Sequence, residues 1–551
     1  MSEAVEAMFP TLSAAQLDRL RPHGHVRDIA RGDVLVRIGD RIDHLFVVIS
    51  GQIEIVGTRV ASERSIATLH AGQFSGETSM LSGRPGIARL SVTEPGQVLE
   101  VDRERLLALL QNDPDLSEFL MRAFLLRRAE IIEQGLGDVV LVGSGHSPET
   151  LRIREFLTRN GHPHSYIDLD RDSGVQELLD RLHVGPGAVP VVICRGTMVL
   201  RNPTNIALAE CLGFNEVMDQ GHIHDVVIAG AGPAGLGAAV YAASEGLDTL
   251  VIETYAPGGQ AGSSSLIENY LGFPMGISGH ELASRANTQA QKFGARVAVA
   301  KTAAQLQCGE KPYAIGLSDD VVGGRVRARA IIIATGAEYR KPALDNLKDF
   351  EGAGVYYAAT PVEMQICRGE EVIVVGGGNS AGQAAVYLSQ NVKKVQMVVR
   401  ASGLAETMSR YLARRIEETP SITVRTNTEI VGLAGNGRLE SVVCRNHETG
   451  AEERHDIGHV FVMAGAVPNT HWLDGCLTLD ANGFIKTGAE LSREDLVAAK
   501  WPLTRAPLLL ESSRPGVFAV GDVRSGSVKR VASAVGEGSI AVALVHQVLR
   551  E

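Results

Sequence analysis

Three glycines with the spacing G-x-G-x-x-G follow an apolar run near the middle of the chain. Residues 225–229, DVVIA, predict a buried strand, and Gly230, Gly232 and Gly235 come directly after it. In this arrangement the first glycine permits a tight turn, the second lets a pyrophosphate approach the backbone, and the third lets a helix pack closely against the strand. These residue types at this spacing therefore predict a site that binds a dinucleotide.

A carboxylate completes the same unit. Residues 248–252 predict a second strand, and Glu253 ends it 23 positions after Gly230. A carboxylate at this distance can accept hydrogen bonds from the hydroxyl groups of an adenosine ribose. The helix between the strands begins near Pro233 and Ala234, where its free N–H groups would bind the pyrophosphate. The stretch therefore predicts a whole dinucleotide-binding βαβ unit and not an isolated glycine-rich turn.

A second unit of this kind begins at residue 371 and ends differently. Its turn has the pattern G-x-G-x-x-A, formed by Gly376, Gly378, Asn379, Ser380 and Ala381. Arg400 ends the second strand, 24 positions after the first glycine. A cation there suits the 2′-phosphate of NADPH better than a bare ribose diol. Because the two sites end in opposite charges, we expect two different nucleotides in one protein.

The composition favours a soluble multidomain protein and excludes several classes of function. The chain has 551 residues, which is enough for about three to five domains. The net charge of −11 leaves no basic surface for nucleic acid or an anionic membrane. The N-terminus lacks a basic segment followed by an apolar core, and we expect no apolar run as long as a membrane span. We therefore expect a cytoplasmic protein.

Six cysteines are scattered along the chain, at positions 194, 211, 308, 367, 444 and 476. No two of them have the spacing C-x-x-C, so we expect neither a zinc nor an iron-sulfur site, nor a vicinal dithiol. We expect each cysteine to be a reduced thiol in the core or at the surface.

The elements around these motifs predict a multidomain fold. Short apolar runs separated by turns predict an N-terminal β-barrel or jelly roll with a connecting helix, in residues 1–136. The runs GDVLVRIGD, SGQIEI and FSGE resemble the cyclic-nucleotide-binding domain. The resemblance implies that Glu77 binds a ribose hydroxyl, but the position of the phosphate-binding arginine holds Gly86, with Arg84 and Arg89 nearby. We expect the fold without cyclic-nucleotide binding, because a cyclic phosphate would lose its bidentate partner.

Residues 137–220 predict a small α/β unit that resembles glutaredoxin and other thioredoxin-like domains. The resemblance includes Val189-Pro190, where the family has a cis-proline. The family's C-P-x-C would fall on Ser147 to Thr150, so both thiols are missing. Because hydroxyl groups cannot exchange disulfides, we expect this unit to serve docking or packing.

Residues 221–551 resemble the low-molecular-weight thioredoxin reductases, which implies two Rossmann-like nucleotide-binding domains. The FAD-binding domain would be split into 221–343 and 467–551, with the NADPH-binding domain, 344–466, between the parts. In this family the NADPH domain rotates, and the proteins are commonly homodimers. The resemblance implies that FAD binds Gly230, Gly232, Pro233, Ala234, Gly235, Glu253, Gly259, Gln260, Asn269, Thr335, Gly336, Gly521, Asp522, Arg530 and Val531.

The sequence departs from this family at three places. The family's C-A-T-C-D aligns with residues 358–362, which read Ala-Ala-Thr-Pro-Val, and Cys367 comes too late to replace either thiol. The family's His-Arg-Arg reads Val-Arg-Ala at 399–401, so one NADPH arginine of two remains. The segment 487–513 is long and contains Trp501, which could pack on the core or mark a partner surface.

These observations predict an FAD-dependent NADPH oxidoreductase in which the flavin, and no side chain, carries the chemistry. Electrons would pass from the flavin directly to a quinone, oxygen, a ferredoxin-like protein or an external disulfide. One alternative is a thioredoxin-disulfide reductase that uses non-vicinal or external thiols. Another is a flavin-bound sensor or scaffold.

Overall fold

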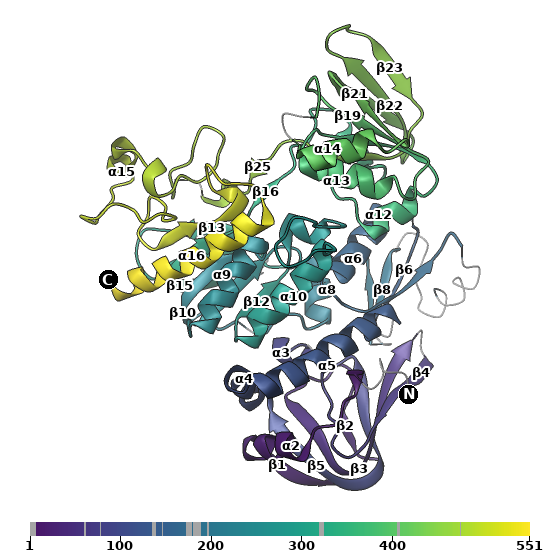
Figure 1. Cartoon of the computed structure of the whole chain (residues 1–551), viewed down its shortest axis with the longest axis vertical. Coiled ribbons are helices and arrows are strands. Elements are labelled where there is room, and N and C mark those ends of the chain that lie inside the picture. The colour runs from purple at the N-terminus through teal and green to yellow at the C-terminus, as the bar shows by residue number, and fades with distance from the viewer. Residues whose placement is uncertain are drawn as a thin grey trace.

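The computed structural model describes most of the chain, namely residues 7–59, 62–77, 79–134, 139–145, 147–171, 179, 189–195, 198–216, 218–318, 324–404, 408–473 and 475–551. The N-terminal barrel lies at one end, the small α/β unit and the region of the large sheet lie side by side next to it, and the region of β18 to β24 lies at the far end (Figure 1).

The barrel is one curled antiparallel sheet with the order β1-β5-β3-β4, and β2 pairs with β5. Its strands are β1 (Gly24–Ile29), β2 (Val34–Val36), β3 (His44–Arg59), β4 (Ser62–Leu69) and β5 (Ala88–Asp102). The long strands β3 and β5 shift register at several points along their pairing, and such irregularities let a sheet bend around its core. Two helices, α4 (Arg103–Asn112) and α5 (Pro114–Glu133), follow. Phe124 of α5 packs edge-on against Phe74 inside the barrel, with ring centroids 6.2 Å apart.

The small α/β unit has a four-stranded sheet with the order β7-β6-β8-β9. Strand β6 (Val139–Gly143) is parallel to β7 (Ser165–Asp168) and antiparallel to β8 (Val191–Cys194), which pairs with β9 (Met198–Arg201). Helix α6 (Pro148–Arg159) begins after Ser147, whose side chain accepts a hydrogen bond from the N–H of Thr150. The Val189–Pro190 peptide bond is cis. The sequence VQELLDRL at 175–182 is typical of a helix, and it lies almost wholly outside the described residues.

The large sheet has the order β12-β11-β10-β15-β14-β13, and β26 pairs with β15. The βαβ unit expected at 225–253 is present as β10 (Ile223–Ala229), α9 (Pro233–Ser244) and β11 (Thr249–Glu253). The other strands are β12 (Arg296–Val299), β13 (Ala303–Gln307), β14 (Tyr313–Leu317), β15 (Arg325–Ile333) and β26 (Val517–Ala519). Because β26 lies near the C-terminus, two distant parts of the chain build this sheet.

Helix α16 (Val531–Arg550) corrects one expectation from the sequence. It is 20 residues long and apolar enough to cross a membrane, whereas we expected no run of that length. Helix α16 lies along α9 (Figure 1). Ala541, Val542 and Val545 are fully buried in the core that the two helices share. Packing against α9 therefore accounts for the buried apolar side chains of α16.

The second sheet has the order β17-β24-β18-β19-β20. The unit expected at 371–400 is present as β18 (Glu371–Val375), α13 (Asn379–Leu388) and β19 (Lys394–Val398). The other strands are β17 (Val355–Tyr356), β20 (Ile422–Arg425) and β24 (Val460–Val462), and β21 (Thr428–Gly435), β22 (Leu439–Asn446) and β23 (Glu452–His455) form a separate sheet. The chain enters and leaves this region through a two-stranded ribbon of β16 (Ala337–Glu338) and β25 (Val467–Pro468).

Candidate functional site

The first glycine-rich turn leaves room at the position where a pyrophosphate would approach. A Cβ on Gly230 would lie 2.4 Å from the carbonyl oxygen of Ala334, and one on Gly235 would lie 1.9 Å from the carbonyl oxygen of Gly230. A Cβ on Gly232 would meet no atom closer than the Cα of Gly259, at 3.9 Å. The first and third glycines thus allow close packing, and the second faces open space.

Glu253 joins the end of β11 to this turn. One carboxylate oxygen accepts a hydrogen bond from the N–H of Ala231 at 2.7 Å. The other accepts from the N–H groups of Tyr255 and Ala256, at 2.9 and 3.2 Å. Burial raises the pKa of Glu253, and these hydrogen bonds and the charge of Arg159 oppose that rise. Since two carboxylate oxygens offer about four acceptor positions, a ribose hydroxyl can still be accommodated.

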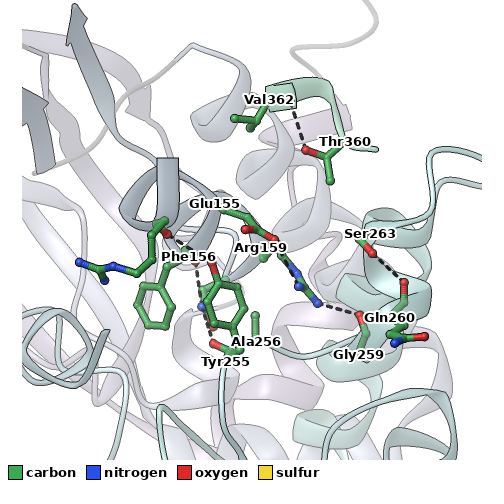
Figure 2. A network of polar contacts seen from close by, with 12 residues as sticks. Glu155, Phe156, Arg159, Tyr255, Ala256, Gly259, Gln260, Ser263, Thr360 and Val362 are labelled. Carbon is green, nitrogen blue, oxygen red and sulfur yellow. Dashed lines mark hydrogen bonds and ion pairs between the residues drawn. The ribbon is translucent and has the colours of Figure 1, made fainter. Parts of the chain in front are cut away.

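Arg159, at the end of α6, reaches this site from the small α/β unit. Its Nη2 donates to the carbonyl oxygen of Gly259 at 2.7 Å (Figure 2), and its guanidinium lies 5.2 Å from the ring centroid of Tyr255. Its Nε is buried and has no hydrogen-bond partner among the described residues. A buried, unpartnered donor beside Glu253 and Gly259 fits a site that accepts an anionic nucleotide. We did not expect this residue, because no nucleotide-binding motif contains it.

Further contacts fix the end of α6 against the loop after β11. The side chain of Asn160 donates to the carbonyl oxygen of Tyr255 at 3.1 Å. The rings of Phe156 and Tyr255 meet edge-on with centroids 5.7 Å apart (Figure 2). The hydroxyl group of Tyr255 donates to the carbonyl oxygen of Arg152 at 3.2 Å. The small α/β unit is therefore packed directly against the first nucleotide site.

The fold brings several residues expected at the FAD site together. A Cβ built on Gly230 would lie 3.1 Å from the Cα of Thr335. A Cβ built on Gly521 would lie 2.9 Å from the Cβ of Ala234. Gly336 follows Thr335 with a φ of 64°, and Gln260 donates to the carbonyl oxygen of Ala337 at 2.6 Å.

Other expected residues lie at the edges of this region. Asp522 lies in a short 3-10 helix (Gly521–Val523), and burial raises its pKa. Arg530 is the exposed residue that precedes α16, and Val531 begins that helix. Asn269 is exposed, and no described contact joins it to the glycine-rich turn.

The second glycine-rich turn has the same features as the first. Gly376 has a φ of 138°, and a Cβ there would lie 2.6 Å from the carbonyl oxygen of Met463. A Cβ on Gly378 would meet nothing within 4 Å. Asn379 begins α13, and its side chain accepts from the N–H of Ser409 at 2.9 Å. Ala381 is buried and Arg400 is exposed at the end of β19, where it is free to meet a nucleotide from solvent.

Tyr339 lies between the two nucleotide sites. Burial raises the pKa of its hydroxyl group, a hydrogen bond with Ser380 lowers it, and the charge of Asp522 raises it. Ser380 belongs to the second glycine-rich turn, and Asp522 follows Gly521, which lies against Ala234 of the first. The structure thus places the two sites close enough for one side chain to interact with both.

Helix α12 (Pro361–Ile366) occupies the place where the resemblance puts a redox dithiol. Thr360 caps this helix, and its hydroxyl oxygen accepts from the N–H of Val362 at 3.2 Å (Figure 2). Glu363 returns a hydrogen bond by accepting from the N–H of Thr360 at 2.9 Å. Cys367 follows the helix and is buried, which raises the pKa of its thiol to about 12. This thiol is poorly suited to redox chemistry at neutral pH.

Two of the cysteines correct the expectation that all six are reduced. Cys308 and Cys476 form a disulfide across 168 positions of the chain, with Cα atoms 6.0 Å apart. It joins the segment after β13 to the segment after β25, so it links the two distant parts of the chain that build the large sheet. No spacing of cysteines indicates this pair, because only the fold brings the two positions together.

One cluster of possible metal ligands is better explained as an ion-pair network. His222, His224 and Asp248 offer ligand atoms within 4.8 Å of one another. Arg296, however, lies 3.1 Å from both His224 and Asp248. A guanidinium at this distance already compensates the carboxylate and would repel a cation.

The comparisons with known proteins agree with this geometry. Residues 224–538 match the family model described as pyridine nucleotide-disulphide oxidoreductase. The chain belongs to this family. Residues 26–113 match the cyclic nucleotide-binding domain, which confirms the expectation for the N-terminal barrel.

Similar proteins in this oxidoreductase family are thioredoxin reductases. The chain is 34% identical to the thioredoxin reductase of Treponema pallidum over 323 residues, and this match covers 58% of the chain and 94% of the relative. It is 33% identical over 346 residues to that of Bacillus subtilis, covering 61% and 97%. The crystal structure of Lactococcus lactis thioredoxin reductase matches with a TM-score of 0.53 and 28% identity, over 60% of this chain and all of that one.

Family membership makes this chain an oxidoreductase. The thioredoxin reductase family uses FAD and NADPH, and the two sites of this pyridine nucleotide-disulphide oxidoreductase fit both. The open space at Gly232 and the buried donor of Arg159 suit a pyrophosphate-containing nucleotide. The open space at Gly378 suits a second one.

Proposed function

We propose that this oxidoreductase transfers electrons from NADPH through FAD directly to an external acceptor, without an internal dithiol. The start of α12 carries this proposal. Ala358 and Pro361 occupy the two positions that the resemblance assigns to redox cysteines, and neither side chain can form a disulfide. Cys367 lies nearby, but its thiol is buried and its pKa is raised.

The first site would hold FAD along its glycine-rich turn, with the pyrophosphate beside Gly232 and the adenosine near Glu253. Arg159 would add a cation and fix the backbone of Gly259. Asp522 would lie at the ribityl chain, and Arg530 and Val531 at the pyrimidine end of the flavin. When bound, FAD supplies the two-electron chemistry that links NADPH to the acceptor.

The second site would hold NADPH between its glycine-rich turn and Arg400. The pyrophosphate would bind the N–H groups at the start of α13, near Asn379 and Ser380. Arg400 would bind the 2′-phosphate, and Tyr339 would stand where the two nucleotides approach each other. Its neighbours Ser380 and Asp522 support this placement.

The small α/β unit would support the site without relaying electrons. Its strand order β7-β6-β8-β9, with β8 antiparallel to β6, supports a thioredoxin-like fold. Ser147 and Thr150 stand at the start of α6, where that fold places its thiols, and they cannot replace them. The acceptor would be a quinone, oxygen, a ferredoxin-like protein or an external disulfide, and we expect a cytoplasmic homodimer.

An anaerobic titration with NADPH tests the proposal. Full reduction should need about one NADPH per FAD, whereas an additional redox-active disulfide would raise the requirement to about two. A screen of the four acceptor classes with the reduced protein would then identify the partner. Consumption of two equivalents would contradict the proposal.

The disulfide favours a second candidate, a thioredoxin-disulfide reductase that uses Cys308 and Cys476. Strand β13 is at the edge of the large sheet, and β14 and β15 separate it from β10. At roughly 4.8 Å per strand, the pair lies about 14 Å across the sheet from the strand that leads into the glycine-rich turn. We therefore favour direct transfer. Turnover with oxidised thioredoxin that is efficient in the native chain and absent in a Cys308→Ser variant would support the second candidate.

A further inference from the structure

A cavity of about 200 Å³ lies within the N-terminal barrel, between its strands and helix α5. Its walls are mainly apolar side chains from the strands, the turn before β5, and α5, including Val36, Ile42, Ile55, Ile87, Leu90 and Ile131. Met8 and Phe9, which precede the barrel, also line it. The cavity therefore suits a ligand that is largely apolar.

The turn before β5, where a cyclic phosphate would bind, contributes no guanidinium group to the cavity. Gly86 and Ile87 are buried there. Arg89 donates to both carboxylate oxygens of Glu63 at 2.8 Å. Arg84 donates to the carbonyl oxygen of Asn160 at 3.1 Å, and its guanidinium lies 4.2 Å from the ring centroid of Phe214. Both arginines near the phosphate position are thus engaged elsewhere.

Another arginine supplies a buried donor at the cavity. Arg127 of α5 is 4% exposed and lines the cavity. Its Nε donates to the carbonyl oxygen of Met8 at 2.7 Å, and its Nη1 donates to that of Gly76 at 2.8 Å. Its Nη2 is buried and has no hydrogen-bond partner in the part of the chain that the structure describes. A buried donor without a partner is costly, so this atom points to an acceptor on a ligand.

The buried charges around the cavity favour an anion. Glu77 lines the cavity and lies 3.4 Å from Arg128. The charge of Glu77 also acts on Arg84 and Arg127, so one buried carboxylate serves three guanidinium groups, of which only Arg127 lines the cavity. Burial lowers the pKa of Arg127 to about 9, and the charge of Glu77 opposes that fall. Glu130 and Arg64 also line the cavity, but their charges offset each other. One buried negative charge on a ligand would reduce the excess of positive charge.

We propose that this cavity binds a small apolar carboxylate in place of a cyclic nucleotide. The carboxylate would accept a hydrogen bond from Nη2 of Arg127, and the apolar body would lie against Ile87 and Ile131. A cavity of about 150 Å³ holds the six carbon atoms of benzene, so by proportion this one, at about 200 Å³, has room for about eight non-hydrogen atoms, close to the size of a medium-chain fatty acid.

Isothermal titration calorimetry on the FAD-loaded full chain tests the proposal with octanoate, 1-octanol and cAMP. We expect one octanoate per chain, bound at least about tenfold more tightly than 1-octanol, because a hydrogen bond to a charged group is worth about that factor. We expect cAMP to bind more weakly than octanoate. Equal affinity for the acid and the alcohol would refute the role of Arg127. Tighter binding of cAMP, or no binding of octanoate, would refute the ligand class.

Two variants locate the binding in the cavity. Arg127→Met should remove the preference for the acid while keeping most of the apolar stem. Because Arg127 also bonds Met8 and Gly76, Ile131→Phe provides a second test, since it fills the cavity and leaves the arginine in place. Val34→Ala, on an exposed strand position that does not line the cavity, is the control. Unchanged octanoate affinity in a folded Ile131→Phe variant would show that the ligand binds elsewhere.

Discussion

Replacing Arg159 with alanine should weaken FAD binding, although this residue lies outside both nucleotide-binding units. The substitution removes the buried Nε donor that has no partner among the described residues, and a hydrogen bond from such a charged donor to FAD would be worth about 1.5–3 kcal/mol. The hydrogen bond that fixes the backbone of Gly259 is lost as well. The substitution also removes the guanidinium above Tyr255 and the positive charge beside Glu253. A loss of about 2 kcal/mol in binding free energy corresponds to an increase of roughly 30-fold in the Kd for FAD.

The assay is a titration of the deflavinated protein with FAD, followed by the quenching of flavin fluorescence. Arg154→Ala is the matched control, because Arg154 lies on the same helix but bonds Gln365 of the second nucleotide region, at 2.9 Å. The melting temperature of both apoproteins shows whether the small α/β unit remains folded. If Arg159→Ala and Arg154→Ala give FAD affinities within about threefold of each other, the role assigned to Arg159 is wrong.

Three further predictions concern the nucleotide turns and the cysteines. Gly232→Val should yield mainly apoprotein, because a branched side chain would fill the open space beside the turn, and full flavin content in the purified variant would contradict this. Arg400→Ala should reduce the preference for NADPH over NADH, measured as the ratio of kcat/KM for the two nucleotides, by about ten- to a hundredfold, because a charge-assisted contact is worth about that factor. An unchanged preference would mean that Arg400 does not bind the 2′-phosphate. Cys367 of the native protein should resist labelling by iodoacetamide at pH 8, because a thiol with a pKa of about 12 is a thiolate in roughly one molecule in ten thousand. Labelling is measured by mass spectrometry, and rapid labelling would show that the thiol is accessible.

The nucleotide-binding units could be predicted because each is local in sequence. The strand, the glycines and the terminal charged residue all fall within 30 residues, and β10, α9 and β11 appear as expected. Arg159 could not be predicted, because it precedes Glu253 by 94 residues and belongs to another unit. The Cys308–Cys476 disulfide could not be predicted either, because its cysteines are 168 positions apart in the sequence. The length of the apolar run in α16 was underestimated, because Glu537 and His546 interrupt it in the sequence, whereas the helix as a whole is apolar enough to cross a membrane.

The two ends of α6 hold their neighbours with very different strength. Asn160, Phe156 and Arg159 make buried or half-buried contacts with the loop that follows β11. Towards the NADPH region, α6 offers the exposed hydrogen bond of Arg154 to Gln365 and the partly buried side chain of Leu151. An exposed hydrogen bond contributes only about 0.5–1.5 kcal/mol.

This asymmetry determines which parts would move as one body. If the NADPH region rotates as the resemblance implies, the plane of separation should run between α6 and α12. Among the described residues, the contacts from α6 across this plane are the exposed Arg154–Gln365 hydrogen bond and packing at Leu151 and Pro148. The small α/β unit and the barrel would then stay with the large sheet as the stationary part. A ligand in the barrel would consequently act on the stationary part of the molecule, and its effect would reach the flavin through the end of α6 without following the moving NADPH region.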